Sequence, residues 1–505
     1  MNIRRVRAFL FSDLGILILL ALVRLLMHAL TNDHYGFHRD ELAALDDARF
    51  IAWGYVAYPP LTPFIGRIAL ELLGPSTVGV RLFSGLAQAA ALVLTGLCAH
   101  ELGGKRWSVL MAGLAVWVAT TSFHQGTLFQ YVSFDYLWWV LAAYCMVRLL
   151  KTHDPRWWLG VGAAVGLGME TKYTMAFFAI GIAGSVLLTH NRRYLKSPWL
   201  WGGVSLAAVI FLPNFIWQIR HDFISLQHLS AIHAWDVSIG RADNFLLDQF
   251  LLGANPFLFP LWLMGLYFFF FSRAGQPYRA IGWMYAIPLA LFIAAQGRGY
   301  YLAPAYPMLL AGGAVWVEGR LSAMRSPWSN LVRFGGYGAL VAGAAFIIAL
   351  ALPIAPVNSP LWDFASTANP DLKEELGWPE LVEEVAQIYT SLPDAERAYT
   401  AIYTNNYGEA GAVNLYGPAF GLPPVLSGVN SYGLRGYPEP PPQTLIVVGY
   451  QREDLEPHFA DCVIAGQVPN PYRIQNEEAK APDIFVCRRL KQPWAEFWEQ
   501  MRHFG

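Results

Sequence analysis

Charged residues are scarce in this chain of 505 residues. Asp, Glu, Lys and Arg make up 14% of it, whereas 55% is hydrophobic and the formal net charge is -1. Soluble domains carry roughly 25% charged residues, so the deficit excludes an ordinary soluble protein. Together with long uncharged runs, it indicates a chain that crosses a membrane several times. No basic tract occurs, and nothing in the sequence indicates a nucleic-acid partner.

Cysteine is rare as well, and several kinds of motif are missing. Four cysteines are too few for a disulfide scaffold. Cys98 and Cys145 lie in apolar runs, whereas Cys462 and Cys487 lie in the polar tail and could pair if that tail is extracytoplasmic. No internal repeat, low-complexity tract or nucleotide-binding glycine motif is visible. The glycines of "GAAVGLG" lie in an apolar helix and are better explained by close helix packing.

Long apolar runs are what the sequence does contain. A bilayer core needs roughly 20 apolar residues per helix, and the first 353 residues predict a polytopic α-helical membrane domain with about eleven spans, several of them short. The first run follows "MNIRRVR", as in a signal peptide, but Arg24 and His28 interrupt it and no cleavage site follows, which favours a retained anchor. The expected spans are Leu10–Leu30, Thr77–Ala99, Ser108–Phe123, Val132–Leu150, Trp157–Met169, Tyr173–Leu188, Leu200–Ile219, Phe250–Phe271, Ile281–Ala295, Tyr301–Val317 and Phe334–Pro353.

Lys and Arg in the connections predict the orientation, because cytoplasmic loops carry an excess of both. Every second connection between spans holds most of the Lys and Arg residues. This alternation continues along the whole chain only if "ETK" separates two spans. The first loop (31–76), the "RHDF" loop, "GRGYY" and the tail are then extracytoplasmic. The residues assigned to the cytoplasm are Arg4, Arg5, Arg7, Lys105, Arg106, Arg148, Lys151, Arg156, Arg192, Arg193, Lys196, Arg273, Arg279, Arg320, Arg325 and Arg333.

The tail, residues 354–505, has the composition of a soluble domain. "PELVEEVAQIYTSL" has helical periodicity, whereas "AYTAIYT", "TLIVVGY" and "DIFVCRRL" are typical of short buried strands. The sequence therefore predicts a small extracytoplasmic α/β domain after the membrane domain.

Polar residues gather on the predicted extracytoplasmic side, and polar groups near membrane depth are usually functional. This set supplies acids that could take a proton and cations that could hold a phosphate. Transfer of a sugar from a lipid phosphate needs both: a carboxylate to accept the proton of the attacking hydroxyl and a cation to stabilise the departing phosphate. The set comprises Asp40, Glu41, Asp46, Asp47, His124, Asp135, Glu170, Lys172, Arg220, His221, Asp222, Arg298, Tyr300 and Tyr301.

Structural interpretations of the same residues stay open. "ELAALDDARFIAWG" has helical periodicity, with Leu42, Leu45, Phe50 and Trp53 on one side, so an interfacial helix could carry the acidic pair on its solvated face. The cations could snorkel at span ends. The acid at 135 could be hydrogen-bonded within the bundle, and the histidine at 221 could be a loop residue. No spacing compels a metal cluster of His124, Asp46 and Asp47.

"RDELAALDDARFIAWGYVAYPPLTPFIGRI" resembles the first extracytoplasmic loop of bacterial glycosyltransferase family 39 proteins. These are relatives of the dolichyl-phosphate-mannose protein mannosyltransferases and have the GT-C membrane fold. The resemblance covers most of the chain and is specific for the family, not for the substrate. It continues through "SFDYLWWVLAAY", "GLGMETKYTMAFF", "RHDFISLQHL", "NPFLFPLWLMGL", "GRGYYLAPAYPMLLAGGA" and "NYGEAGAVNLYGPAFGLPPVLSGVNSYG".

The resemblance implies roles for several residues. The acidic pair would supply the catalytic base of an inverting single displacement or position the acceptor, with Asp40 favoured over Glu41. "TKY" makes Lys172 a contact to the donor phosphate, and "GRGYYLAP" makes Arg298 another, where the family often has Lys. "RHDF" departs from the family's His-Gly-Trp-Pro style, which weakens a sugar contact there. The further candidates are Arg220 for the phosphate and Tyr58, Asp135, His221, Tyr300 and Tyr301 for the substrates.

The leading hypothesis is therefore a bacterial inner-membrane glycosyltransferase. It would move a hexose or pentose from a polyprenyl-phosphate donor to an envelope lipid, glycan or protein, with the active site outside the cytoplasm and no cofactor required. A divalent metal is not indicated. The alternatives are a transporter or flippase of lipid-linked sugars, which predicts mid-bilayer charges and inverted repeats, and an assembly protein whose tail binds partners.

Overall fold

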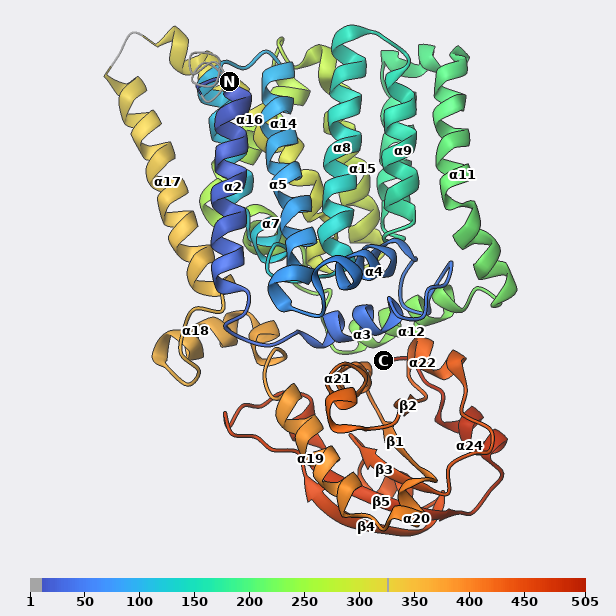
Figure 1. Cartoon of the computed structure of the whole chain (residues 1–505). Coiled ribbons are helices and arrows are strands. Elements are labelled where there is room, and N and C mark those ends of the chain that lie inside the picture. Colours follow the sequence, from blue (N-terminus) through green and yellow to red (C-terminus); the bar gives the residue numbers. More distant parts are fainter. Residues whose placement is uncertain (1–10, 325–326) are drawn as a thin grey trace, which may run out of the picture.

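The computed structural model describes residues 11–324 and 327–505, and most of them form helices (Figure 1). Each of the eleven expected spans overlaps one helix of the described bundle, so the polytopic helical fold is confirmed. Arg4, Arg5, Arg7, Leu10 and Arg325 lie outside the described residues. The bundle helices are α2 (Asp13–Thr31), α5 (Thr77–Glu101), α6 (Arg106–Val118), α8 (Tyr131–Thr152), α9 (Trp157–Met169), α10 (Met175–Leu187), α11 (Pro198–Arg220), α14 (Phe259–Phe271), α15 (Arg279–Ala294), α16 (Tyr306–Ala323) and α17 (Trp328–Ala351).

Several of these helices are short for a bilayer. By length and composition, five described helices could cross a membrane: α2, α5, α8, α11 and α17. A sixth candidate is the pair Phe245–Ala254 and Pro256–Phe271, which is bent by 88°. Helices α6, α9 and α10 are apolar but have only 13 residues each. The expected break at "ETK" is present, because Glu170, Thr171 and Lys172 lie between α9 and α10.

Glycines allow two bundle helices to approach closely. A Cβ on Gly162 of α9 would overlap the backbone carbonyl of Gly203 in α11, and a Cβ on Gly203 would overlap the carbonyl of Trp158. The packing interpretation of "GAAVGLG" is therefore confirmed.

The C-terminal part contains a five-stranded sheet in the order β2-β1-β3-β5-β4. Strands β1 (Thr400–Thr404), β2 (Leu426–Ser427) and β3 (Thr444–Val448) pair in parallel, whereas β5 (Asp483–Leu490) runs antiparallel to β3 and to β4 (Phe459–Gln467). The expected strands correspond to β1, β3 and β5, and the expected helix to α19 (Trp378–Ser391). The sequence reading missed β2 and β4, because β2 has two residues and β4 is mostly exposed at the sheet edge. A disulfide between Cys462 and Cys487 joins β4 to β5.

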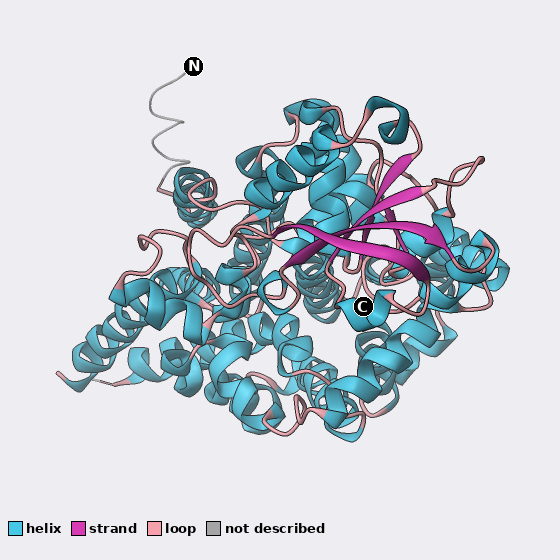
Figure 2. Ribbon diagram, turned by 90° about the horizontal axis from the view of Figure 1, so that it is seen from below, coloured by secondary structure: helices cyan, strands magenta, loops and turns pink. Residues whose placement is uncertain are grey.

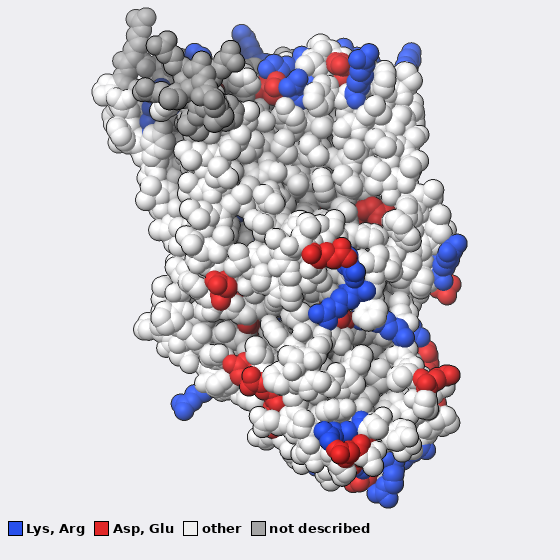
Figure 3. All heavy atoms as spheres, in the orientation of Figure 1, with Lys and Arg blue, Asp and Glu red and all other residues white. Residues whose placement is uncertain are grey.

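The sheet lies against one end of the bundle, and short helices lie between the two parts (Figures 1 and 2). These are α3 (Arg39–Asp47), α4 (Leu61–Leu73) and α12 (Ile224–Ser238). In Figure 3, Lys and Arg gather at the opposite end of the bundle, and the surface below them carries little charge. The fold thus has a charged end, an apolar middle and an end covered by the sheet.

Helix α21 (Tyr407–Tyr416) of the C-terminal part packs directly on α3. The contact needs glycine: a Cβ on Gly411 would lie 2.6 Å from the carbonyl carbon of Leu42, and one on Gly408 would lie 2.7 Å from the Cβ of Arg39. This close approach gives "NYGEAGA" a structural reason, and it brings the C-terminal part against the first loop.

The helix of the first loop is shorter than expected. It ends at Asp47, so Phe50 and Trp53 lie beyond it and are exposed by 52% and 56%, whereas Asp46 and Asp47 are buried. The periodicity prediction was wrong at this end, and the acids are buried because they have partners from the C-terminal part of the chain.

Candidate functional site

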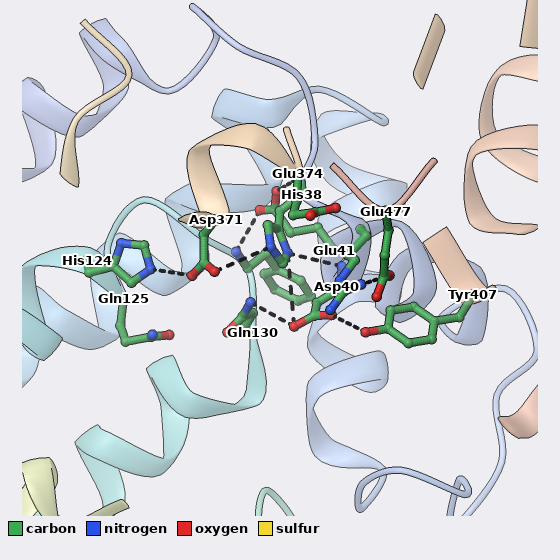
Figure 4. A network of polar contacts seen from close by, with 12 residues as sticks. His38, Asp40, Glu41, His124, Gln125, Gln130, Asp371, Glu374, Tyr407 and Glu477 are labelled. Carbon is green, nitrogen blue, oxygen red and sulfur yellow. Dashed lines mark hydrogen bonds and ion pairs between the residues drawn. The ribbon is translucent and has the colours of Figure 1, made fainter. Parts of the chain in front are cut away.

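Asp40 lies in the first turn of α3, with its carboxylate held from two sides (Figure 4). Its Oδ2 accepts a hydrogen bond from Nε2 of Gln130 at 3.1 Å, and its Oδ1 accepts one from the hydroxyl of Tyr407 at 3.0 Å. His38 caps the helix and its Nδ1 lies 4.0 Å from Oδ2. The Asp40 side chain is still 35% exposed. It is therefore a fixed but accessible carboxylate.

Glu41 has a different environment, since it is fully buried. Its carboxylate accepts hydrogen bonds from Arg81 at 2.6 and 2.9 Å, from the backbone amide of Phe129 at 2.7 Å and from the amide of His38 at 2.8 Å. The solvated-face interpretation is wrong for this residue. Its oxygens hold α3, α5 and the segment before α8 together, which leaves them little capacity to accept a proton from a substrate.

Asp46 and Asp47 also have partners: Arg435, which the sequence did not indicate, and Tyr58, which was expected to contact a substrate. Arg435 of α22 (Asn430–Arg435) forms ion pairs with both, and Tyr58 donates to Oδ2 of Asp47 at 2.6 Å. Burial raises the pKa of Asp47 to about 6, although Arg435 opposes the shift. These acids join the first loop to the C-terminal part, and Tyr58 orients one of them.

Lys172 is buried among aromatic rings. Its ammonium lies 4.2 Å from the ring centre of Tyr301, 4.6 Å from that of Tyr300 and 5.4 Å from that of Tyr131, within cation–π distance of all three. The ammonium makes no hydrogen bond or ion pair with any residue that the structure describes, and Lys172 is only 8% exposed. Burial lowers the pKa of the ammonium, and the carboxyl of Asp135, which lies beyond ion-pair distance, opposes this shift. A buried ammonium without an anion in direct contact is suited to bind one.

Gln130 and Tyr131 connect this cation to Asp40. They are consecutive residues at the start of α8: the amide of Gln130 contacts Asp40, and the ring of Tyr131 faces Lys172. The ring of Tyr58 lies 5.6 Å from that of Tyr131. The acid and the cation are therefore on neighbouring elements, with aromatic side chains between them.

Arg298 already has an anionic partner. Its guanidinium makes two hydrogen bonds to Asp236 of α12, at 2.6 and 3.0 Å, and Arg241 pairs with the same carboxylate. Part of its charge is thus neutralised within the protein, and Lys172 is the less satisfied of the two cations. Sequence reading missed Asp236 because it lies in an exposed, weakly patterned helix.

Three other predicted residues have local structural contacts instead. The ring of His221 stacks on Trp217 at 3.9 Å and its Nδ1 faces the carbonyl of that residue, at the C-terminus of α11. Arg220 is exposed at the same helix end. Asp135 accepts from the indole of Trp139 at 3.0 Å, as expected for an acid hydrogen-bonded within the bundle. The structure does not bring these three side chains into hydrogen-bond contact with Asp40.

Several partners of the acidic pair went unrecognised in the sequence. Arg81 was detectable as a charge within an apolar run, but Gln130 and Tyr407 carry no such signal.

His124 and His38 flank Asp371, with nitrogen–oxygen distances of 3.0 and 4.0 Å (Figure 4). Within the described residues, no group of three or more His, Cys, Asp or Glu side chains could hold a metal ion.

Comparisons with known proteins agree with this architecture. Residues 57–217 match the family model of the dolichyl-phosphate-mannose-protein mannosyltransferases. The chain is 26% identical over 266 residues to the lipid A galacturonosyltransferase RgtD of Rhizobium johnstonii, a match that covers 50% of this chain and 54% of that protein. The chain thus spans about half the length of the curated relative that it matches.

Solved structures show the same fold over nearly the whole chain. ArnT from Cupriavidus metallidurans, bound to undecaprenyl phosphate, aligns over 94% of this chain and 98% of its own, with a TM-score of 0.60 at 14% identity. The mycobacterial arabinofuranosyltransferase AftD aligns over 94% of this chain and 40% of its own, with a TM-score of 0.50 at 16% identity. The fold expected from the resemblance is therefore confirmed: the chain has the GT-C fold of ArnT, and its residues 57–217 are similar to the dolichyl-phosphate-mannose-protein mannosyltransferases.

Proposed function

We propose that this protein transfers one monosaccharide from a polyprenyl-phosphate donor to a cell-envelope acceptor, with inversion at the anomeric carbon. One observation carries the proposal: an accessible, hydrogen-bonded carboxylate, Asp40, and a buried ammonium without an anion, Lys172, lie on elements joined by Gln130 and Tyr131. The family match and the undecaprenyl phosphate bound to the structural relative support the same chemistry.

Asp40 is the proposed base. One carboxylate oxygen accepts the proton of the acceptor hydroxyl while that hydroxyl oxygen bonds to the anomeric carbon. The bond from the anomeric carbon to the phosphate oxygen breaks, and its electron pair leaves with the polyprenyl phosphate. Gln130 and Tyr407 each donate to the carboxylate, which fixes its direction. Glu41 is an unsuitable base because five hydrogen bonds occupy its oxygens.

Lys172 is the proposed phosphate contact. An ammonium that already lacks an anion gains more from an arriving phosphate than a guanidinium paired with a carboxylate does. Arg298 would orient the phosphate, while its own guanidinium is held by Asp236, the carboxylate with which Arg241 also pairs. The rings of Tyr300 and Tyr301 would exclude water around the ammonium and strengthen its interaction with the anion.

The proposed site is extracytoplasmic, in a bacterial inner membrane. The Lys- and Arg-rich connections favour the cytoplasm for the opposite end of the bundle. A disulfide between Cys462 and Cys487 in the C-terminal sheet supports an oxidising compartment on the site's side.

The test is transfer of labelled sugar from a polyprenyl-phosphate donor to an extracted envelope fraction, in proteoliposomes containing the full chain. Asp40→Asn keeps the size of the side chain and is expected to lower the rate about 10²–10⁴-fold. Asp363→Asn, at an exposed position in α18 (Pro360–Ala368), is the matched control and should transfer at the parent rate. Parent-like activity of Asp40→Asn would remove it from the mechanism, and movement of the donor across the bilayer without any glycosylated product would favour a flippase.

A further inference from the structure

An open groove of about 470 Å³ lies between the end of α8 and the start of α9, at the end of the bundle opposite the sheet (Figure 1). Helix α8 begins next to Gln130, which contacts Asp40, and runs for 22 residues to Thr152, so its two ends are roughly 30 Å apart. The groove is therefore separate from the proposed transfer site. Its lining residues are Arg148, Thr152, Asp154, Arg156, Trp157 and Gly160.

Arg156 gives the groove a positive charge that no described residue neutralises. Its side chain is exposed, and its guanidinium lies over the ring of Trp199, 5.8 Å from the ring centre. The guanidinium makes no ion pair or hydrogen bond with any residue in the part of the chain that the structure describes. Because a guanidinium can donate two parallel hydrogen bonds to phosphate oxygens, this accessible cation is available to a phosphate group.

The other charges around the groove largely cancel. Glu101 pairs with Arg148 at 2.8 Å and with Lys151 at 2.9 Å, so one carboxylate serves two cations. The acid that lines the groove, Asp154, uses one oxygen to accept the backbone amide of Arg156 at 3.0 Å. These three cations and two acids leave one positive charge in excess, which matches the single negative charge of a phosphodiester.

The setting of the groove favours a lipid headgroup over a soluble anion. Tryptophan is enriched at the level where helices leave a bilayer. Here Trp157 lines the groove, and Trp199 and Trp201 at the start of α11 are exposed by 37% and 56%. Beyond Gly160, α9 continues as an apolar helix. Basic pockets between helices at this level bind the headgroups of anionic lipids.

We propose that this groove binds the headgroup of an anionic phospholipid, with the guanidinium of Arg156 on its phosphate and Arg148 as a second cation. The proposal goes beyond the proposed function, because binding here requires neither the sugar donor nor the acceptor. The lipid would belong to the leaflet opposite the transfer site. A zwitterionic lipid fits less well, because its phosphate is already neutralised by its own ammonium group.

The test is lipid binding to the full chain in detergent micelles, measured by native mass spectrometry. Phosphatidylglycerol and phosphatidylethanolamine with identical acyl chains are compared, and the parent should bind phosphatidylglycerol more tightly. Arg156→Gln should weaken this binding about fivefold, the effect of one cation near the membrane surface. Arg273→Gln is the matched control: it removes an exposed arginine in the connection between α14 and α15, which does not line the groove, and should bind as the parent does.

A second variant separates lost binding from lost folding. Asp154→Asn keeps an oxygen for the amide of Arg156 but removes the acid of the groove. It should bind phosphatidylglycerol up to about fivefold more tightly, a gain that misfolding cannot produce.

Two further measurements locate the lipid and its source. A photoreactive phosphatidylglycerol should label residues 148–160 of the parent, and unlabelled phosphatidylglycerol should compete, whereas millimolar glycerol 3-phosphate should not. Arg156→Gln should transfer sugar at the parent rate in phosphatidylcholine proteoliposomes, so a failure of this site and a failure of the proposed function are told apart. Equal binding of the two lipids by the parent, undiminished binding by Arg156→Gln, weaker binding by Asp154→Asn, or competition by glycerol 3-phosphate would overturn the proposal.

Discussion

Substitution of Glu41 by Gln distinguishes the structural role of Glu41 from the catalytic role proposed for its neighbour Asp40. Glu41 forms a fully buried ion pair with Arg81 and accepts two backbone amides, from His38 and Phe129. Removing one partner of a buried pair typically costs about 3–5 kcal/mol, because the other charge stays buried without compensation. Glu375 lies 3.3 Å from the same guanidinium and compensates in part, so we expect the lower end, about 3 kcal/mol.

The assay is unfolding of the full chain in mixed micelles with increasing SDS, followed by Trp fluorescence at constant lipid and temperature. Glu41→Gln should unfold at a clearly lower SDS fraction, whereas Asp40→Asn, with a partly exposed side chain, should unfold near the parent. Glu71→Gln breaks an exposed ion pair with Arg67 and is the control, expected within about 0.5 kcal/mol of the parent. If Asp40→Asn were destabilised and Glu41→Gln were not, the assignment of a structural and a catalytic acid would be reversed.

Four other expectations follow from named contacts. Lys172→Met should lower kcat/KM for the lipid donor about 10–100-fold, because one charge-assisted contact to the phosphate is lost. Lys172→Arg keeps the positive charge and should retain much of the parent's kcat/KM. Equal values for the parent and both variants would exclude the phosphate role of Lys172. Tyr407→Phe should lower kcat about 3–10-fold, because the Asp40 carboxylate loses one of the two hydrogen bonds that fix its direction. An unchanged kcat would make the contact purely structural. Gly411→Ala should loosen the contact between α21 and α3 and speed limited proteolysis between the bundle and the sheet, whereas Gly319→Ala, with nothing within 4 Å of the added Cβ, should not. Burial raises the pKa of Glu375 from 4.5 to about 7, so the folded state binds this proton more tightly than the unfolded chain does. The free energy of unfolding should therefore fall, on the order of 1–3 kcal/mol, as the pH rises through this interval. Glu375→Gln should flatten this pH dependence, and an equally steep dependence in that variant would assign the effect to another group.

The membrane architecture followed from local properties of the sequence. Apolar runs located all eleven bundle helices, because the need to satisfy backbone hydrogen bonds in lipid leaves a long apolar segment little choice but a helix. The strands β1, β3 and β5 were visible for a similar reason, since each is a short, nearly continuous buried run. The ends were less predictable: the helix of the first loop ends at Asp47, and the acids of its last turn pair with Arg435, almost 400 residues later.

The chemistry of the acidic pair shows the same division. The sequence alone determined that acids and cations share one side of a membrane protein with a GT-C resemblance, because charge, hydropathy and motifs are properties of neighbouring residues. Only the tertiary structure decided that Glu41 is buried against Arg81, that Asp40 is accessible between Gln130 and Tyr407, and that Lys172 lacks an anion while Arg298 has one. Two adjacent carboxylates with the same local sequence acquire different environments because their partners come from distant helices. Burial and pairing set the energy of a charge, and both exist only once those helices pack.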